Sequence, residues 1–225
     1  TTAQTATGKI LETYEAMRDK GYEELVVITI SSQLSGTYDG AVLASNMVEG
    51  IKVHVFDYKS VAYPEAKMAL TAAEMAKSGK SVKAITKALE VIRDNHGLLI
   101  SVDTLRYLVK NGRLSGASGF VGSLLKIKPM LELTKDGKVE AAEKVRTRSK
   151  AIAKMIEKFT SENPEDSLAE VFIVHANADD EVEKLKATLL DKYPSLKAIQ
   201  DFPLTPVVGA HGGPGALALG WLKHA

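Results

Sequence analysis

Hydrophobic and polar positions repeat with two different periods along the first part of this chain. Residues 25–30 form a run rich in β-branched side chains, which predicts a strand covered on both faces. Residues 10–18 instead place apolar side chains three or four positions apart, which predicts an amphipathic helix ending near Gly21. Because the two periods keep alternating, we expect a small parallel-sheet domain. Its predicted strands are 25–30 and 52–56, and its predicted helices are 10–18, 37–47, 64–77 and 81–93.

The pattern changes in the second part of the chain. An Asp136-Gly137 pair separates two strand-like runs, and such a pair supplies the positive φ angles of a tight hairpin turn. We therefore predict an α/β fold with a parallel α/β domain in residues 1–96 and an α+β domain with a mixed or antiparallel sheet in residues 97–225. The strands expected in the second domain are 97–102, 128–133, 139–145, 169–175, 198–202 and 216–222, with helices at 104–110, 115–125, 149–159 and 179–192. For 216–222 a helix is the alternative, and we favour a strand.

Composition limits the possible classes of function. Lys and Arg number 29 against 28 Asp and Glu, and this net charge of +1 provides no field to attract nucleic acid or an anionic membrane. The absence of cysteine excludes disulfides and thiolate metal sites and fits a reducing cytoplasm. No apolar run approaches the ~20 residues of a membrane span. We therefore expect a cytoplasmic protein without nucleic-acid partners or stable membrane insertion.

The strand at 25–30 leads into a loop rich in hydroxyl groups. Chain that leaves the carboxyl end of a parallel strand enters the region where open α/β sheets bind ligands. Hydroxyl and amide donors at the start of the next helix can bind a carboxylate or a phosphate. Helix capping alone needs one hydroxyl, so capping and an anion pocket both remain open. The loop hydroxyls are those of Ser31, Ser32, Ser35 and Thr37.

Further candidates for anion binding occur in the second half. Arg113, in Asn-Gly-Arg-Leu-Ser, and Arg146, in Val-Arg-Thr-Arg, could each clamp an anion, although surface arginines are commonly just solvated. His211 lies in the glycine-rich stretch 208–215, for which we predict a flexible turn that lets backbone approach a ligand. The five histidines lack the i, i+4 spacing of a helical zinc site, so no metal site is predicted. The stretch 213–218 matches a dinucleotide fingerprint, but too little chain follows it, and no cofactor is expected.

The least polar region of the chain lies between residues 115 and 133. Ordinary core is one interpretation. The other is the lining of a slot for an apolar ligand, because ligand pockets are mostly apolar with few polar groups. The candidate lining residues are Phe120, Leu124, Ile127 and Met130.

An enzymatic alternative uses the same residues. Ser35 as nucleophile, His211 as base and Asp57 as acid would make an acyl-ester hydrolase, since triads are defined by geometry rather than by order in the chain. Against it, the sequence before Ser35 lacks the first glycine of the nucleophile elbow. A third possibility is a purely structural interaction protein.

Six motifs occur along the chain, at residues 31–38, 111–115, 125–129, 145–147, 175–177 and 209–215. Taken in this order, they resemble those of the DegV family. They cover essentially the whole sequence, and although each is modest alone, the ordered set is specific. The resemblance implies a two-domain, DegV-like EDD fold with a Rossmann-like first domain.

The resemblance also implies a function. Family members characterised as fatty-acid-binding proteins bind one long-chain fatty acid between their two domains and have no catalytic activity. They present its carboxylate to a separate fatty acid kinase, which makes acyl phosphate for phospholipid synthesis. We therefore expect a lipid-binding protein, with a bound fatty acid instead of a cofactor and a fatty acid kinase as its protein partner.

Individual site residues follow from the same resemblance. Thr2 is similar to the family's carboxylate-binding threonine, and Ser35 is similar to its serine, with Ser31 and Ser32 beside it. Arg146 and His211 are similar to residues of the head-group and phosphate region, where we also place Arg113. The family's N-terminal portion has no counterpart in this sequence, and Ala3 replaces a usual serine. We therefore expect either part of a longer protein or an incomplete pocket.

Overall fold

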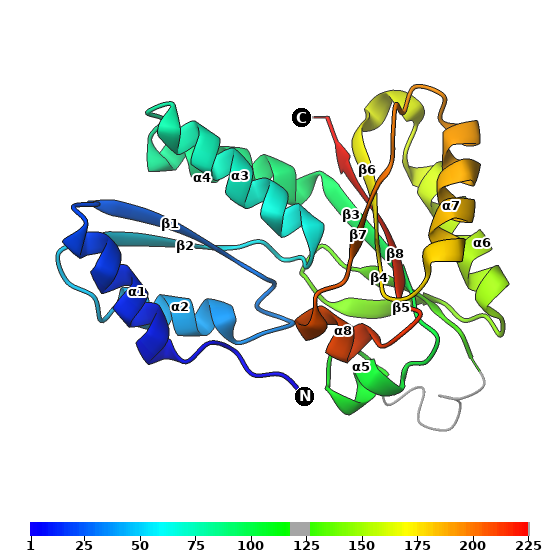
Figure 1. The fold of residues 1–225 in the computed structure, drawn as a ribbon, viewed down its shortest axis with the longest axis horizontal. Coiled ribbons are helices and arrows are strands. Elements are labelled where there is room, and N and C mark those ends of the chain that lie inside the picture. Colours follow the sequence, from blue (N-terminus) through cyan, green and yellow to red (C-terminus); the bar gives the residue numbers. More distant parts are fainter. Residues whose placement is uncertain (118–126, 225) are drawn as a thin grey trace. The chain divides into compact units, whose positions relative to one another are not determined.

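The computed structural model describes residues 1–117 and 127–224 (Figure 1). The chain divides into two compact units. The N-terminal unit comprises Thr2–Asp94 and Lys135–Gly137, and the C-terminal unit comprises Asn95–Thr134 and Lys138–Ala225 together with Thr1. The α/β class predicted from the sequence is confirmed. The predicted helix 115–125 lies mostly outside the described residues.

The N-terminal unit is built around two parallel strands with helices on both faces (Figure 1). The strands pair in register from Glu24 opposite Lys52 to Thr29 opposite Asp57. Side chains alternate along β1, so Val27 packs toward one pair of helices and Ile28 toward the other. The strands are β1 (Glu24–Thr29) and β2 (Lys52–Asp57); α1 (Thr7–Asp19) and α2 (Thr37–Ser45) cover one face, and α3 (Tyr63–Lys77) and α4 (Val82–Asp94) cover the other.

The C-terminal unit contains a mixed sheet whose described strands follow the order β5-β4-β3-β8-β6-β7. Strand β8 pairs antiparallel with both β3 and β6, while β7 pairs parallel with β6. The apolar run at the end of the chain is therefore a strand, as favoured from the sequence, and it pairs on both sides within the sheet. The strands are β3 (His96–Ser101), β4 (Met130–Leu133), β5 (Val139–Glu143), β6 (Leu168–His175), β7 (Gln200–Pro203) and β8 (Leu217–Lys223).

The main core of the C-terminal unit lies between this sheet and two helices, α6 (Arg148–Glu162) and α7 (Asp179–Lys192). Phe159 of α6 is fully buried, and its ring meets that of Trp221 edge-on with 5.3 Å between centroids. Strand β8 also contains Gly220, which pairs with Phe172 of β6. A Cβ on Gly220 would lie 2.1 Å from the Phe172 ring, so this ring packs against the sheet only because residue 220 is a glycine. Two shorter helices, α5 (Arg106–Lys110) and α8 (Pro206–Gly212), complete the described helices of this unit, and a 3₁₀ turn spans Glu165–Ser167.

Two local predictions have different outcomes. The Asp-Gly hairpin is confirmed, with Gly137 at φ 91° between β4 and β5. The flexible turn predicted for 208–215 is wrong in its first half, which forms helix α8. Pro206 fixes a helical φ in the first turn, and Gly213, at φ 76°, ends the helix, so the glycines between them stay helical.

Candidate functional site

The first two hydroxyls of the serine loop (residues 31–37) hold the loop together. Ser31 is fully buried; its Oγ donates to the Gly137 carbonyl at 2.7 Å and accepts from the Gln33 amide at 3.2 Å. The Ser32 hydroxyl donates to Asp57 Oδ2 at 2.6 Å, and its amide donates to Oδ1 at 3.2 Å. Both hydroxyl hydrogens are therefore used inside the N-terminal unit.

The last two hydroxyls of the loop are arranged differently. Ser35 Oγ and Thr37 Oγ1 lie 2.8 Å apart, half-buried, at the start of α2. The Thr37 amide donates to Ser35 Oγ at 3.3 Å. Two hydroxyls carry two hydrogens, and the bond between them uses only one. The pair can therefore donate its second hydrogen to an anion at the helix start, where unsatisfied amides and the helix dipole also favour negative charge.

The N-terminal segment runs beside this pair. A Cβ on Gly36 would lie 1.9 Å from Gln4 Oε1, so the absence of a side chain at Gly36 lets the segment approach the start of α2. Thr2, two residues earlier, is half-buried and belongs to the same unit. The structure thus brings the Thr2 segment and the serine loop to one end of α2.

Two acidic residues, Asp57 and Glu65, form hydrogen bonds at the serine loop or at the residue that precedes it. They had not been assigned this role from the sequence. Asp57 also accepts from the Lys59 amide at 2.9 Å, which holds Lys59 at a φ of 57°. Burial raises the pKa of the Glu65 carboxyl, and a hydrogen bond to the Ile30 backbone offsets part of that rise. An acidic residue in the first turn of α3 was the available signal, although it indicates helix stabilisation as readily as a contact with another loop.

In the C-terminal unit, Arg113 and His211 lie close enough to interact. Asn111 Nδ2 donates both to the Tyr107 carbonyl at 3.0 Å and to the Ala210 carbonyl at 3.1 Å, which joins α5 to α8. Burial, and secondarily the Arg113 charge, lowers the pKa of His211. The imidazole is therefore neutral at pH 7 beside a permanent cation.

The remaining predicted residues are placed as follows. Arg146 is exposed and immediately precedes Thr147, whose Oγ1 caps α6 by accepting from the Lys150 amide. Ile127 is half-buried before β4, and Met130 is fully buried in the main core. Phe120 and Leu124 lie outside the described residues.

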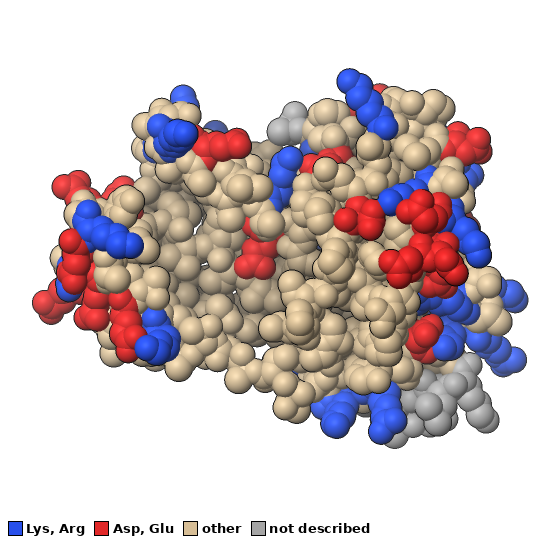
Figure 2. Space-filling view, viewed as in Figure 1, with Lys and Arg blue, Asp and Glu red and all other residues tan. Residues whose placement is uncertain are grey.

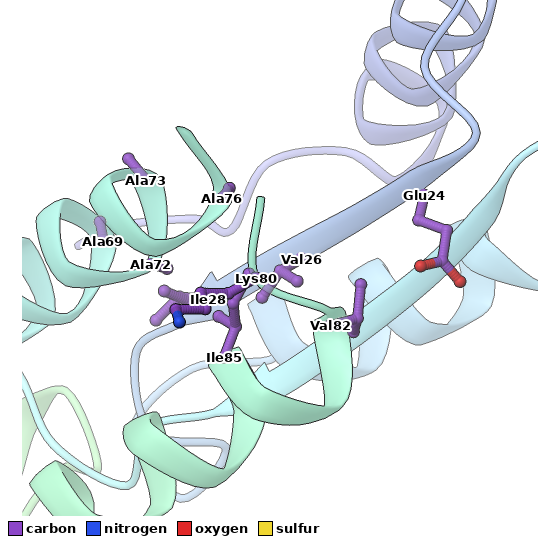
Figure 3. A pocket seen from close by; sticks show the side chains of 10 residues that line it. All are labelled: Glu24, Val26, Ile28, Ala69, Ala72, Ala73, Ala76, Lys80, Val82 and Ile85. Atoms are coloured by element: carbon purple, nitrogen blue, oxygen red, sulfur yellow. The ribbon is translucent and has the colours of Figure 1, made fainter. Parts of the chain in front are cut away.

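A cavity of about 380 Å³ lies in the N-terminal unit between β1 and helices α3 and α4 (Figure 3). Its walls are mainly apolar, with Val26 and Ile28 from the strand and alanines from α3. Glu24 and Lys80 add one charge of each sign. None of the predicted site residues lines it.

The charged surface and the described helices bear on the classes of ligand and of location that this protein can have. On the face drawn in Figure 2, acidic and basic side chains both occur, in keeping with 29 Lys and Arg against 28 Asp and Glu in the sequence. Within residues 1–117 and 127–224, no cluster of His, Asp and Glu has the arrangement of a metal site. In the same residues, each helix is too short or too polar to cross a membrane.

Comparison with known proteins places this arrangement in a family. A family model described as an uncharacterised protein of the DegV family matches residues 1–224. The DegV domain-containing protein SACOL0812 of Staphylococcus aureus is 37% identical over 222 residues, covering 99% of this chain and 77% of that protein. The chain therefore belongs to the DegV family.

Solved structures agree with this assignment. The structure of DegV from Bacillus subtilis, called a fatty acid binding protein, superposes with a TM-score of 0.85 at 34% identity and covers all of this chain and 79% of that one. The fatty acid binding DegV family protein SAG1342 from Streptococcus agalactiae superposes with a TM-score of 0.87 at 26% identity, covering 99% of this chain and 78% of that one.

Proposed function

We propose that this protein binds a long-chain fatty acid and presents its carboxylate to a separate fatty acid kinase, which forms acyl phosphate. The observation that carries the proposal is the Ser35–Thr37 hydroxyl pair at the start of α2, with 2.8 Å between its oxygens and one hydrogen left to donate. The proteins from B. subtilis and S. agalactiae that share this fold are named as fatty acid binding, which supports the choice of ligand.

In the N-terminal unit, Ser35 and Thr2 are the proposed carboxylate contacts. A carboxylate accepts several hydrogen bonds, and hydroxyl and amide donors satisfy it without burying a full ion pair. Ser31 and Ser32, which were also expected to contact the carboxylate, already donate to Gly137 and Asp57. We assign them an indirect role, in which they hold Ser35 in place.

In the C-terminal unit, Arg113, His211 and Arg146 are the proposed head-group and phosphate residues. An acyl carboxylate that becomes an acyl phosphate gains negative charge, and guanidinium groups stabilise such charge. The lowered pKa of His211 keeps its imidazole neutral at pH 7, so it can donate or accept a hydrogen bond there without adding a second cation beside Arg113.

The acyl tail is expected to provide most of the affinity. Each buried methylene contributes about 0.8 kcal/mol, so a long chain contributes on the order of 10 kcal/mol before the costs of association. Ile127 and the sequence-predicted Phe120, Leu124 and Met130 remain candidates for its lining. That the tail lies between the two domains also stays a prediction. Because the kinase step consumes a nucleotide, we place the protein in the cytoplasm.

We also propose that the chain is not itself an enzyme. The hydrolase alternative needs Asp57 to orient His211, but the Asp57 carboxylate accepts hydrogen bonds from the Ser32 hydroxyl and the Ser32 and Lys59 amides. An activated acyl ester distinguishes the two. Steady turnover that disappears in Ser35→Ala would support the hydrolase, whereas the carrier predicts none.

The binding proposal is tested by titrating the delipidated protein with palmitic acid. Ser35→Ala removes one donor and is expected to weaken binding by about 10- to 150-fold, because a hydrogen bond to a charged group contributes about 1.5–3 kcal/mol. Ser161→Ala removes an exposed hydroxyl that bonds only within its own helix turn and serves as the control. Equal affinities for all three proteins would contradict the assignment of Ser35.

A further inference from the structure

Arg148, the last residue of the Val-Arg-Thr-Arg motif, to which no role was assigned from the sequence, joins three separate segments of the C-terminal unit. Its Nε and Nη2 donate to the two carboxylate oxygens of Glu181 at 3.0 and 2.7 Å. Its Nη1 donates to Ser101 Oγ at 3.1 Å, and its Nη2 also donates to the Gly215 carbonyl at 2.6 Å. The side chains of Arg148 and Glu181 are only 16% and 32% exposed, so water competes weakly for these bonds.

One of these bonds fixes the turn that follows α8. The Gly215 peptide is held on both sides, because its amide donates to the Ala176 carbonyl at 2.7 Å while its carbonyl accepts from Arg148. Gly215 has φ 76°, and a Cβ there would lie 2.6 Å from Asp103 Oδ2, so the turn has no room for a side chain at this position. His211 lies four residues before Gly215, in helix α8, which this turn follows.

The same guanidinium fixes a second segment of the proposed site. Arg148 is the first residue of α6, and Arg146 lies two positions before it. Thr147 between them caps the helix, and the Val145 carbonyl accepts from the Lys128 amide at 2.8 Å. The chain around Arg146 is therefore held by the Arg148 side chain on one side and by the Lys128–Val145 backbone hydrogen bond on the other.

From this geometry we infer that Arg148 is a positioning residue, which sets His211 and Arg146 for the carboxylate of an acyl ligand without touching that ligand. The inference rests on the proposed function. A lysine cannot replace it, because one ammonium cannot serve a carboxylate through two parallel bonds while also reaching Ser101 and Gly215. Glu181 shares the role, since it holds the guanidinium in the required plane.

The test compares the wild type with Arg148→Lys and with Glu181→Gln, as full chains. Lys158→Gln is the matched control, because it removes ion pairs to Glu132 and Glu162 elsewhere on α6. Each delipidated protein is titrated with palmitic acid and with the corresponding fatty alcohol, which lacks the carboxylate. Unfolding is measured in parallel to confirm that each variant is folded.

Arg148→Lys and Glu181→Gln are expected to lower the affinity for palmitic acid roughly tenfold while changing that for the alcohol less than about twofold. A merely structural role would lower both affinities by the same factor, and that result would overturn the inference. Failure of the wild type to bind palmitic acid would instead overturn the proposed function.

A second measurement needs no lipid. Titration of the His211 imidazole by NMR reports its surroundings directly, with His211→Gln used to assign the resonance. Loosening of the turn exposes the ring, so the pKa of His211 is expected to rise toward its ordinary value in Arg148→Lys and to stay unchanged in Lys158→Gln. An unchanged pKa in a folded Arg148→Lys would overturn the link between Arg148 and His211, whatever the lipid result.

Discussion

The hydroxyl of Ser31 donates a 2.7 Å hydrogen bond to the carbonyl of Gly137, 106 positions further along the chain. Ser31 follows β1, and Gly137 lies at the tip of the β4–β5 hairpin. A Cβ on Gly137 would lie 2.2 Å from Ser31 Oγ and 3.1 Å from the Lys59 backbone. The serine loop therefore packs against a segment that is remote from it in the sequence.

Removal of this hydroxyl should destabilise the protein. Ser31→Ala leaves the buried Gly137 carbonyl and the Gln33 amide without this partner, which costs about 1–3 kcal/mol of unfolding free energy. Chemical denaturation measures the change. The exposed Ser161→Ala should stay within about 0.5 kcal/mol of the wild type. A Ser31→Ala loss no larger than that of Ser161→Ala would show that the bond does not hold the loop.

Glu65 gives stability a distinct pH dependence. Its pKa is raised in the folded protein, so the folded state holds the proton more tightly than the unfolded state does. The resulting stabilisation is complete below the ordinary carboxyl pKa of 4.5 and is lost as the pH rises through the raised value. Glu65→Gln keeps an oxygen that can accept from Ile30 but cannot ionise. The variant should therefore gain stability relative to the wild type as the pH rises from 4.5 to 7, and a constant difference would refute this.

His211 changes the stability of the protein with pH in the opposite direction to Glu65. Its pKa is lowered in the folded protein, so the unfolded state binds a proton more readily. The contribution of the neutral ring is complete above its ordinary pKa of 6.5 and is lost as the pH falls through the lowered value. The unfolding free energy of the wild type should therefore fall relative to that of His211→Gln as the pH is lowered below 6.5. A wild type that gains stability relative to His211→Gln over the same range would contradict the assigned surroundings of the ring.

Two glycine-to-alanine substitutions should change the stability of the protein in opposite directions. Gly220→Ala places a Cβ 2.1 Å from the Phe172 ring in the middle of the sheet, and such overpacking costs about 1–3 kcal/mol. Gly8 lies in α1 with open space where a Cβ would project, so Gly8→Ala should stabilise the helix by about 0.5–1 kcal/mol. Thermal melting of both variants checks the signs. A neutral Gly220→Ala would mean that Phe172 has another place to pack.

Local patterns account for most of the elements. The β-branched run before Ser31 indicated β1, and Asp136-Gly137 indicated the hairpin, because in both cases the signal lies within a few adjacent residues. Helix α8 was not predicted, because its glycines are typical of a flexible turn and this signal outweighs the helix start indicated by Pro206. In that stretch the helix depends on the fixed φ of the proline and on contacts made by other segments.

The candidate site was only partly predictable for the same reason. The group of hydroxyl residues after one strand could be recognised in the sequence. Which of them bond within the protein and which can contact a ligand could not be predicted. That depends on Gly137 and Asp57 occupying two of the hydroxyls, and these residues come from other elements. The contacts of Arg148 with Glu181 and Gly215 likewise join positions 33 and 67 residues apart.

The central claim is that the protein carries a fatty acid. Mass spectrometry of lipid extracted from protein purified without added lipid tests it most directly, with heat-denatured protein and the Ser35→Ala variant extracted in parallel. The account predicts a long-chain fatty acid in the wild-type extract and a reduced amount in Ser35→Ala. A wild-type extract without fatty acid, from protein that also fails to take up added palmitic acid, would contradict it.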